Sequence, residues 1–241
     1  TTISNCAIEP EIQDMIFFLK RMGCNINFIG KRKILIIGTK KFKEVVHEVI
    51  FDRIELGTYL IAAALAGKKI TFLKIKPKII NTEIKLLKKM GIKIKIKKNK
   101  IVVFESGKLN SANVKTEPYP GFPTDMQAQV MAMMTLCDGA SVINETIFEN
   151  RFMHVPELTR MGADITVHGS TATVRGIDQL LGAPVMATDL RASMSLILAG
   201  LVADRQTFVN RIYHLDRGYE RLVEKLSAVG AKIIRDANLG I

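Results

Sequence analysis

The sequence is poor in cysteine and in long apolar runs, and both shortages exclude classes of protein. Its three cysteines, Cys6, Cys24 and Cys137, form no CxxC pair and leave an odd count, so buried reduced thiols are expected rather than disulfides. The richest apolar stretches, residues 60–66 and 194–203, are far shorter than the roughly 20 residues of a membrane span. Since the first residues show no pattern of an export or transit signal, we expect a soluble, cytoplasmic protein with no membrane partner.

The sequence also lacks the short motifs of several common enzyme classes. It contains no GxSxG elbow, no phosphate-cradling GxxxxGKS or GxxxxGKT loop, no GxGxxG after a predicted strand and no HExxH. Serine hydrolases, P-loop nucleotide hydrolases and dinucleotide-binding enzymes are therefore disfavoured. No metal is expected either, because the histidines show no metal-ligand spacing; they are His47, His154, His168 and His214.

Positive charge is present but unevenly distributed along the net +12 chain. Residues 1–120 hold 24 Lys and Arg against 10 Asp and Glu, whereas residues 121–241 hold 11 against 13. Much of the lysine lies in residues 68–100, where GIKIKIKKNKIVVF alternates Ile and Lys with the period of a strand that has one buried face. Because aromatic residues that could stack on bases are sparse there, a solvated face is favoured over nucleic-acid binding.

Four copies of a helix, glycine and strand pattern organise the chain. The shared glycines, Gly23, Gly91, Gly162 and Gly230, are 68, 71 and 68 residues apart. Each ends a segment with helical apolar spacing and basic residues near its end, and each precedes a predicted strand. The copies are EIQDMIFFLKRMGCNINFIG, TEIKLLKKMGIKIKIKKNK, VPELTRMGADITVHGSTATVRG and YERLVEKLSAVGAKIIRD.

A second kind of helix lies between these copies, rich in small residues and followed by a β-branched run. One period therefore predicts helix, strand, helix, strand and strand, which indicates an α/β domain built from several copies of one unit. We expect residues 1–56 to be the incomplete tail of a first domain and residues 57–241 to be a second domain of three units. The additional helical segments are GTYLIAAALAG, TDMQAQVMAMMTL and LRASMSLILAGLVA.

A carboxylate stands at the start of the helix predicted in TDMQAQVMAMMTL. Three prolines and a glycine precede Thr124, which is predicted to cap the helix, with Gln127 completing a capping box. Asp125 would then either complement the helix dipole at the surface or act as a rigidly held base. The spacing alone favours the surface acid.

The same arrangement recurs one unit later, in MATDLRAS. Thr188 is predicted to cap a helix that carries Asp189 and Arg191 at its start. An arginine there opposes the helix dipole and requires another reason. A salt bridge to Asp189 or a neighbouring acid, and the binding of an anion beside the helix start, both explain it.

Two further arginines occur in turn-like segments. Arg151 lies with His154 in FENRFMHVPEL, and Arg217 follows Asp216 in HLDRGYER. A lone histidine before a helix is more often structural than catalytic. The three arginines, together with one rigidly placed carboxylate, suit an anionic substrate and the abstraction of a proton.

The motifs FPTDMQAQ, FENRFMHVPEL, RMGA, MATDLRAS and DRGYER, in this order and at these intervals, resemble the UDP-N-acetylglucosamine enolpyruvyl transferases. The resemblance is strong over residues 117–235 and continues before them through EPEI and DRIELGTYLIAAA. It implies an inside-out α/β barrel of repeated βαβαββ units, in agreement with the repeat. It also implies transfer of an enolpyruvyl group from phosphoenolpyruvate to the 3-hydroxyl of UDP-N-acetylglucosamine in peptidoglycan synthesis, with no cofactor.

The resemblance also assigns roles to individual residues through the matching motifs. Asp125 would contact the sugar 3-hydroxyl and act as its general base, and Ile147 would line the UDP-sugar site. Asp189 would orient a cluster of arginines that holds phosphoenolpyruvate and the charge that develops on it. These arginines are Arg151, Arg191 and Arg217.

The chain departs from that family in what it does not contain. The family's N-terminal lysine and its mobile loop with a cysteine proton donor match no segment here, and Cys137 follows an apolar helix, where a core or helix-end position is expected. We therefore expect a fragment with little or no turnover unless it is complemented by the missing N-terminal half. Two alternatives stay open: a relative of enolpyruvylshikimate phosphate synthase, and a non-catalytic anion- or RNA-binding repeat module.

Overall fold

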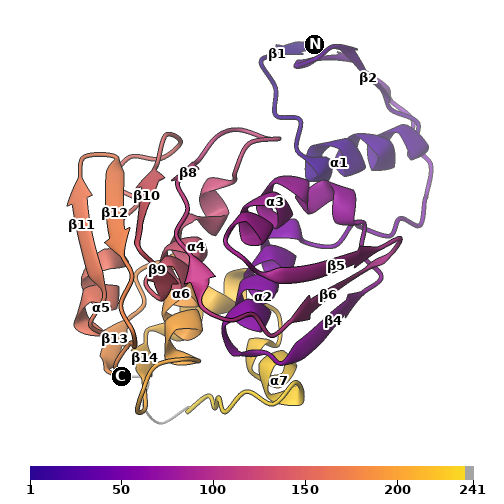
Figure 1. The fold of residues 1–241 in the computed structure, drawn as a ribbon. Coiled ribbons are helices and arrows are strands. Elements are labelled where there is room, and N and C mark those ends of the chain that lie inside the picture. Colours follow the sequence, from indigo (N-terminus) through magenta and orange to yellow (C-terminus); the bar gives the residue numbers. More distant parts are fainter. Residues whose placement is uncertain (237–241) are drawn as a thin grey trace. The chain divides into compact units, whose positions relative to one another are not determined.

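The computed structural model describes residues 1–236 and divides the chain into two compact units, whose elements Figure 1 labels. The first unit comprises residues 1–52 and 118–120, and the second comprises residues 53–117 and the chain from Gly121 onward. The first unit has one sheet and one helix, and the second has several of each. All the residues that the sequence singles out for chemistry belong to the second unit.

The first unit is a small antiparallel sheet packed with one helix. Strand β3 lies between β1 and β2, and Ile16 of the helix is buried with Ile26 and Ile34 of the sheet. Cys6 and Cys24 pack against this core as free thiols. The elements are β1 (Thr2–Ser4), α1 (Pro10–Arg21), β2 (Asn25–Gly30) and β3 (Lys33–Ile37).

Three apolar helices form the centre of the second unit, and each contacts the other two. Every residue of α4 is buried, which is the pattern of a helix that is surrounded by other elements on all sides. Figure 1 shows the three helices between the sheet that contains β4 and the sheet that contains β10. They are α2 (Arg53–Ala66), α4 (Gln127–Met134) and α6 (Leu190–Gly200), and α4 follows the short helix η2 (Thr124–Met126).

The sheets of the second unit are small and mixed. The first has the order β4-β6-β5 and is antiparallel, and the second has the order β11-β12-β10-β8, with β8 parallel to β10. Two parallel pairs, β13-β14 and β7-β9, complete the set. The strands are β4 (Lys69–Leu73), β5 (Lys93–Lys97), β6 (Lys100–Phe104), β7 (Leu109–Asn110), β8 (Val114–Lys115), β9 (Cys137–Asp138), β10 (Ala140–Asn144), β11 (Asp164–His168), β12 (Thr171–Arg175), β13 (Pro184–Met186) and β14 (Phe208–Asn210).

The shared glycines of the repeat end helices as predicted. All four have positive φ angles, between 91° and 102°, in the region that glycine adopts without strain. The first three copies continue into hairpins, β2-β3, β5-β6 and β11-β12. The outer helices are α3 (Asn81–Lys89), α5 (Val155–Arg160) and α7 (Leu222–Ala228), with η1 (Pro77–Ile80) and η3 (Ile212–Arg217) as short additions.

The strand predicted after Gly230 is not formed, so this part of the repeat prediction is wrong. Residues 231–236 have no regular secondary structure. An extended segment becomes a strand only when another backbone hydrogen-bonds with it, and none of the described strands pairs with these residues.

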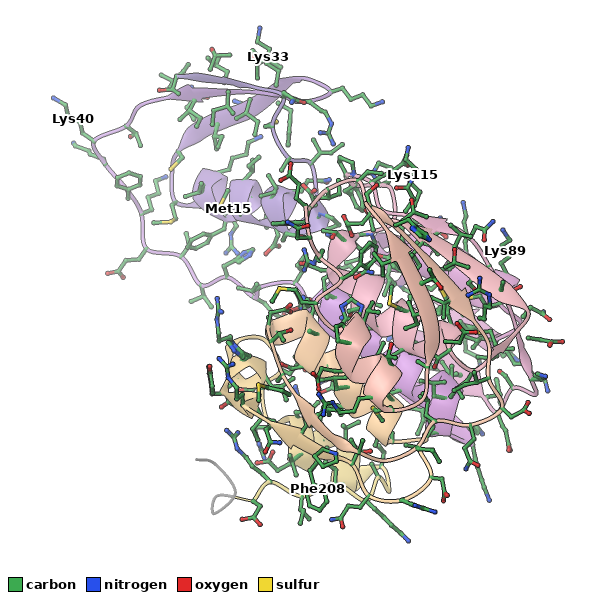
Figure 2. All side chains as sticks on the ribbon, turned by 90° about the vertical axis from the view of Figure 1, so that its left-hand side faces the viewer. Met15, Lys33, Lys40, Lys89, Lys115 and Phe208 are labelled. Carbon is green, nitrogen blue, oxygen red and sulfur yellow. The ribbon has the colours of Figure 1, made fainter. Side chains whose placement is uncertain are left out.

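The alternation of Ile and Lys forms β5, as predicted, but its apolar face is only partly covered. Strand β5 lies at the edge of its sheet, and Ile96 is 42% exposed. Figure 2 shows Lys89 and Lys115 of the second unit with their side chains directed away from the ribbon. Within residues 1–236, the helices are too short or too polar to cross a bilayer.

Candidate functional site

Asp125 bridges two arginines that come from different parts of the second unit. Its Oδ1 accepts a hydrogen bond from Nη2 of Arg151 at 2.9 Å, and its Oδ2 accepts one from Nη2 of Arg191 at 3.2 Å. Asp125 lies on η2, Arg151 lies in the loop between β10 and α5, and Arg191 lies in the first turn of α6. The structure therefore brings together three of the residues that the sequence singles out.

The turn that carries Asp125 is not the capped helix that the sequence predicts. The hydroxyl of Thr124 donates to Oε2 of Glu145 at 2.8 Å and caps no helix, and Gln127, the first residue of α4, is fully buried. The capping box is therefore wrong, because a buried carboxylate competes for the Thr124 hydroxyl. Gly57 allows α2 to approach this turn closely, since a Cβ there would lie 2.8 Å from Cε of Met126.

Two opposing effects set the pKa of Asp125. Partial burial disfavours the charged carboxylate, but the charges and hydrogen bonds of Arg191 and Arg151 outweigh burial and hold the pKa of Asp125 below its usual value. The pKa of Arg191 is raised in turn, because Tyr219 and Asp125 outweigh its own desolvation. The cluster is therefore an ion triad of one carboxylate and two guanidinium groups at neutral pH.

Asp189 caps α6, a position that the sequence assigned to Thr188. Its Oδ1 accepts from the backbone amides of Arg191 at 2.7 Å and Ala192 at 2.9 Å, as an N-cap aspartate does. The salt bridge considered between Arg191 and Asp189 is not formed, because the guanidinium of Arg191 pairs with Asp125 instead. Asp189 thus contacts Arg191 through the Arg191 backbone amide and not through the guanidinium.

Arg217 and Ile147 are exposed and stand apart from the triad in their contacts. Arg217 ends η3, and within residues 1–236 no ion pair joins it to Asp125, which pairs with the other two arginines. Ile147 is 40% exposed, and its backbone amide donates to Oε1 of Glu145 at 2.9 Å. Both side chains are exposed to solvent.

A buried polar network behind Arg191 was missed by the sequence analysis. The hydroxyl of Tyr219 lies 3.0 Å from Oγ1 of Thr58, accepts from Nε2 of Gln129 at 3.2 Å and accepts from Nη1 of Arg191 at 3.3 Å. Tyr219 is 1% exposed, and Gln129 and Thr58 are fully buried. The available signal was Thr58 and Gln129, polar residues within otherwise apolar helices, because most buried polar side chains have hydrogen-bond partners.

Arg151 has two further neighbours, the aromatic ring of Phe148 and the imidazole of His154. The guanidinium carbon of Arg151 lies 4.7 Å from the ring centroid of Phe148, within the range of a cation–π interaction. His154 is buried with Nε2 3.2 Å from Sδ of Met131, and burial lowers its pKa to about 4. A neutral histidine in this position fits the structural role expected for it.

Other features of the described residues lie outside this cluster. Cys137 is buried, with its Sγ against the carbonyl oxygen of Met133, and burial raises the pKa of its thiol to about 12. It is thus the core cysteine that the sequence predicts. Within residues 1–236, no three His, Cys, Asp or Glu side chains are grouped so as to hold a metal ion. A groove of about 1470 Å³ between α2, β4, α6, β14 and α7 is lined by none of the predicted site residues.

Comparisons with known proteins agree on one family. Residues 1–226 match the family model described as EPSP synthase (3-phosphoshikimate 1-carboxyvinyltransferase). Proteins named UDP-N-acetylglucosamine 1-carboxyvinyltransferase from Pelagibacter ubique and Geobacter metallireducens are 56% and 54% identical over 98% of this chain. The chain spans only 56% of the length of each of these relatives.

Solved structures show the same fold. The enolpyruvyl transferase NikO from Streptomyces tendae matches 96% of this chain and 55% of its own, with a TM-score of 0.87 and 28% identity. EPSP synthase from Acinetobacter baumannii matches 78% of this chain and 44% of its own, with a TM-score of 0.58 and 18% identity, which is a likeness of fold alone. The chain belongs to the EPSP synthase family of enolpyruvyl transferases.

Proposed function

We propose that this chain provides the acceptor-sugar side of an enolpyruvyl transferase site, which transfers enolpyruvyl from phosphoenolpyruvate to the 3-hydroxyl of UDP-N-acetylglucosamine. The observation that carries the proposal is the Asp125 carboxylate held between Arg151 and Arg191. Relatives with 51–56% identity carry the name of this activity, which favours it over the shikimate reaction. No feature of the described residues favours an RNA-binding module.

In the proposed reaction, Asp125 accepts the proton of the sugar 3-hydroxyl while the oxygen attacks the central carbon of phosphoenolpyruvate, and the methylene carbon gains a proton from a donor in the part of the relatives that this chain does not match. Loss of a proton from the methyl group so formed, together with departure of phosphate, then restores the double bond. Negative charge is present on the carboxylate and phosphate throughout, and fixed guanidinium groups stabilise it without having to reorganise. Arg151, Arg191 and the exposed Arg217 are the groups proposed for this task, and Ile147 is proposed to contact the UDP-sugar.

The ion triad has a direct consequence for the base. A carboxylate that is paired with two arginines is a weak base, because those charges favour its ionised form. An anionic substrate that shares Arg151 and Arg191 with Asp125, without moving them, would offset part of their positive charge and raise the proton affinity of the carboxylate. We therefore propose that binding of phosphoenolpyruvate prepares Asp125 to accept the proton.

Asp189 is proposed to orient the arginines indirectly. Its carboxylate fixes the first turn of α6 by accepting from two backbone amides, one of which belongs to Arg191. The Arg191 side chain therefore leaves the backbone from a capped and ordered turn. Its guanidinium is then fixed at the far end by Asp125 and Tyr219.

The chain is proposed to be part of a larger, two-domain protein to which such a site belongs. Residues 1–56 would be the tail of a first domain, and residues 57–241 would form a second domain with the inside-out α/β barrel of repeated βαβαββ units. Enolpyruvyl transfer to UDP-N-acetylglucosamine would take part in peptidoglycan synthesis in the cytoplasm. The parts of the relatives that this chain does not match would supply the remaining half of the cleft.

The proposal is tested by measuring phosphate release from phosphoenolpyruvate and UDP-N-acetylglucosamine. We expect little or no release by this chain alone. We expect release when it is mixed with the unmatched portion of the Pelagibacter ubique relative, provided that gel filtration shows the two to associate. Asp125→Ala should abolish this release, whereas Lys95→Ala on the exposed face of β5 should not. An associated mixture that releases no phosphate, or whose release survives Asp125→Ala, would overturn the proposal.

A further inference from the structure

Glu145 is a buried carboxylate that follows β10 and takes part in four hydrogen bonds with uncharged donors. It is 2% exposed. Its Oε1 accepts from Oγ1 of Thr116 at 2.8 Å, from the amide of Ile147 at 2.9 Å and from the amide of Phe148 at 3.1 Å. Its Oε2 accepts from Oγ1 of Thr124 at 2.8 Å.

A carboxylate in this position is costly compared with an apolar or amide side chain of similar size. Burial removes it from water, and its four hydrogen-bond partners are neutral hydroxyl and amide groups rather than a cation. What the carboxylate offers is two oxygens that accept several hydrogen bonds in fixed directions. The hydrogen bonds that Glu145 makes to neighbouring segments therefore offset the free-energy cost of burying its charge.

The segments held by Glu145 carry both ends of the ion pair between Asp125 and Arg151. Oε2 fixes Thr124, the residue before Asp125. Oε1 fixes the backbone of Phe148, whose ring lies 4.7 Å from the guanidinium carbon of Arg151. Thr116, at the end of β8, attaches this junction to the sheet, because β8 pairs with β10 in parallel.

We propose that Glu145 is a positioning residue that holds the Asp125 turn and the loop of Ile147, Phe148 and Arg151 in one fixed geometry. It touches no substrate itself and acts through Thr124 and through the amides of the loop. Because Asp125 must meet two guanidinium groups from different elements, a displacement of about 1 Å would separate it from one of them. The inference rests on the function proposed above and adds a residue to its site.

The alternative is that Glu145 only stabilises the fold. Glu83 provides the matched case, because it is equally buried, at 3% exposed, and pairs with Arg53 of α2 at 3.4 Å. Removal of either carboxylate should lower the free energy of unfolding. Only removal of Glu145 should change the environment of Asp125, and that difference separates positioning from general stabilisation.

The test is the titration of the Asp125 carboxyl carbon by NMR, assigned with Asp125→Asn, in the full chain without any ligand. We expect Glu145→Ala to raise the pKa of Asp125 towards its ordinary value, because the arginines no longer meet it together. Glu145→Gln should keep the wild-type value, since its amide oxygen replaces Oε1 and its NH₂ donates to a Thr124 hydroxyl that now accepts. Glu83→Ala should leave the titration of Asp125 unchanged.

A second variant covers the case in which Glu145→Ala does not fold. Thr124→Val removes one hydroxyl and one of the four hydrogen bonds, and it should also raise the pKa of Asp125. The inference is overturned if a folded Thr124→Val protein titrates at Asp125 as the wild type does. It is also overturned if Glu83→Ala shifts Asp125 as much as Glu145→Ala. Failure of UDP-N-acetylglucosamine to bind would count against the proposed function alone, because this titration needs no ligand.

Discussion

Asp125 and Arg191 are 66 residues apart in the sequence, yet Oδ2 of the carboxylate lies 3.2 Å from Nη2 of the guanidinium. The pair joins the turn before α4 to the first turn of α6, and these two helices pack against each other. Arg151 completes the arrangement from a third segment. The packing of the central helices therefore creates a charged site out of residues that no local motif brings together.

The first prediction concerns the charge that Arg191 places on Asp125. Arg191→Gln should raise the pKa of Asp125, because one of the two guanidinium groups that favour its ionised form is removed. Carboxyl-carbon NMR between pH 2 and 7 measures this directly. Arg175→Gln is the control, since Arg175 pairs with the exposed Asp164 at 3.3 Å, away from the cluster. Equal titration of Asp125 in wild type and Arg191→Gln would contradict the geometry.

The same pair predicts a dependence of stability on pH. The pKa of Asp125 is lower in the folded state than in the unfolded state, where it is roughly 4. Pairing with the arginines therefore stabilises the fold above the unfolded-state pKa, and this contribution is lost as the pH falls through the folded-state pKa. Urea unfolding at pH 5 and at pH 2.5 should therefore show a smaller loss of stability in Asp125→Asn than in wild type. Asp164→Asn is the exposed control, and a loss in Asp125→Asn as large as in wild type would argue against this contribution.

The hydroxyl of Tyr219 is predicted to contribute to stability and not only to packing. Tyr219→Phe leaves Thr58, Gln129 and Nη1 of Arg191 without their shared partner inside the unit. The unfolding free energy should fall by about 1 to 3 kcal/mol, the usual cost of unsatisfied buried polar groups. Tyr213→Phe is the control at a site 54% exposed, where the change should stay within about 0.5 kcal/mol. Similar small changes in both variants would mean that the network is not needed for stability.

His154 predicts a second, separate dependence of stability on pH. Its pKa is lowered to about 4 in the folded state by burial, whereas an unfolded histidine titrates near 6.5. The unfolded state therefore takes up the proton first, so stability falls as pH decreases from about 6.5 towards 4, by up to about 3 kcal/mol. The imidazole proton signals of His154 should stay in the neutral form at pH 5.5. Titration of His154 near pH 6.5 would contradict its burial.

Gly57 is predicted to be intolerant of even a methyl group. An added Cβ would lie 2.8 Å from Cε of Met126, which is 1% exposed and follows Asp125. Gly57→Ala should therefore destabilise the chain by about 1 to 3 kcal/mol, as overpacking of a core does, although alanine favours the helix itself. The control is Gly107→Ala, where no atom lies within 4 Å of the added Cβ. Urea denaturation of the two variants compares them, and equal stability would show that Met126 moves aside freely.

The sequence was sufficient for the first three copies of the repeat, whereas its choice of charged site residues stays a prediction. Helix-ending glycines and apolar spacing are local signals, so the helices before Gly23, Gly91 and Gly162 and the strands after them were predicted correctly. The strand after Gly230 failed because strand formation depends on a partner, which local spacing does not reveal. The same limit applies to Thr124, whose hydroxyl was expected to cap a helix and instead meets Glu145, 21 residues away.

Contacts across the unit were beyond the sequence for a physical reason. Asp125 pairs with Arg151 and Arg191 only because α4, α6 and the loop after β10 pack together. Each of these segments, considered alone, is compatible with other partners. Tyr219 and Gln129 lay within motifs that were recognised, but their hydrogen bonds to one another follow only from burial. The motifs grouped Arg217 with the triad. That Arg217 binds the same ligand as Arg151 and Arg191 stays a prediction.

The most direct measurement is calorimetric titration of the purified chain with UDP-N-acetylglucosamine, beside an Asp125→Ala variant shown to fold by circular dichroism. We predict weak binding by the wild-type chain that the variant loses, because the carboxylate proposed to contact the sugar is already held in place by Arg151 and Arg191. Binding that is unaffected by Asp125→Ala, or no binding by a cooperatively folded wild-type chain, would contradict the claim that this chain carries a preformed acceptor site.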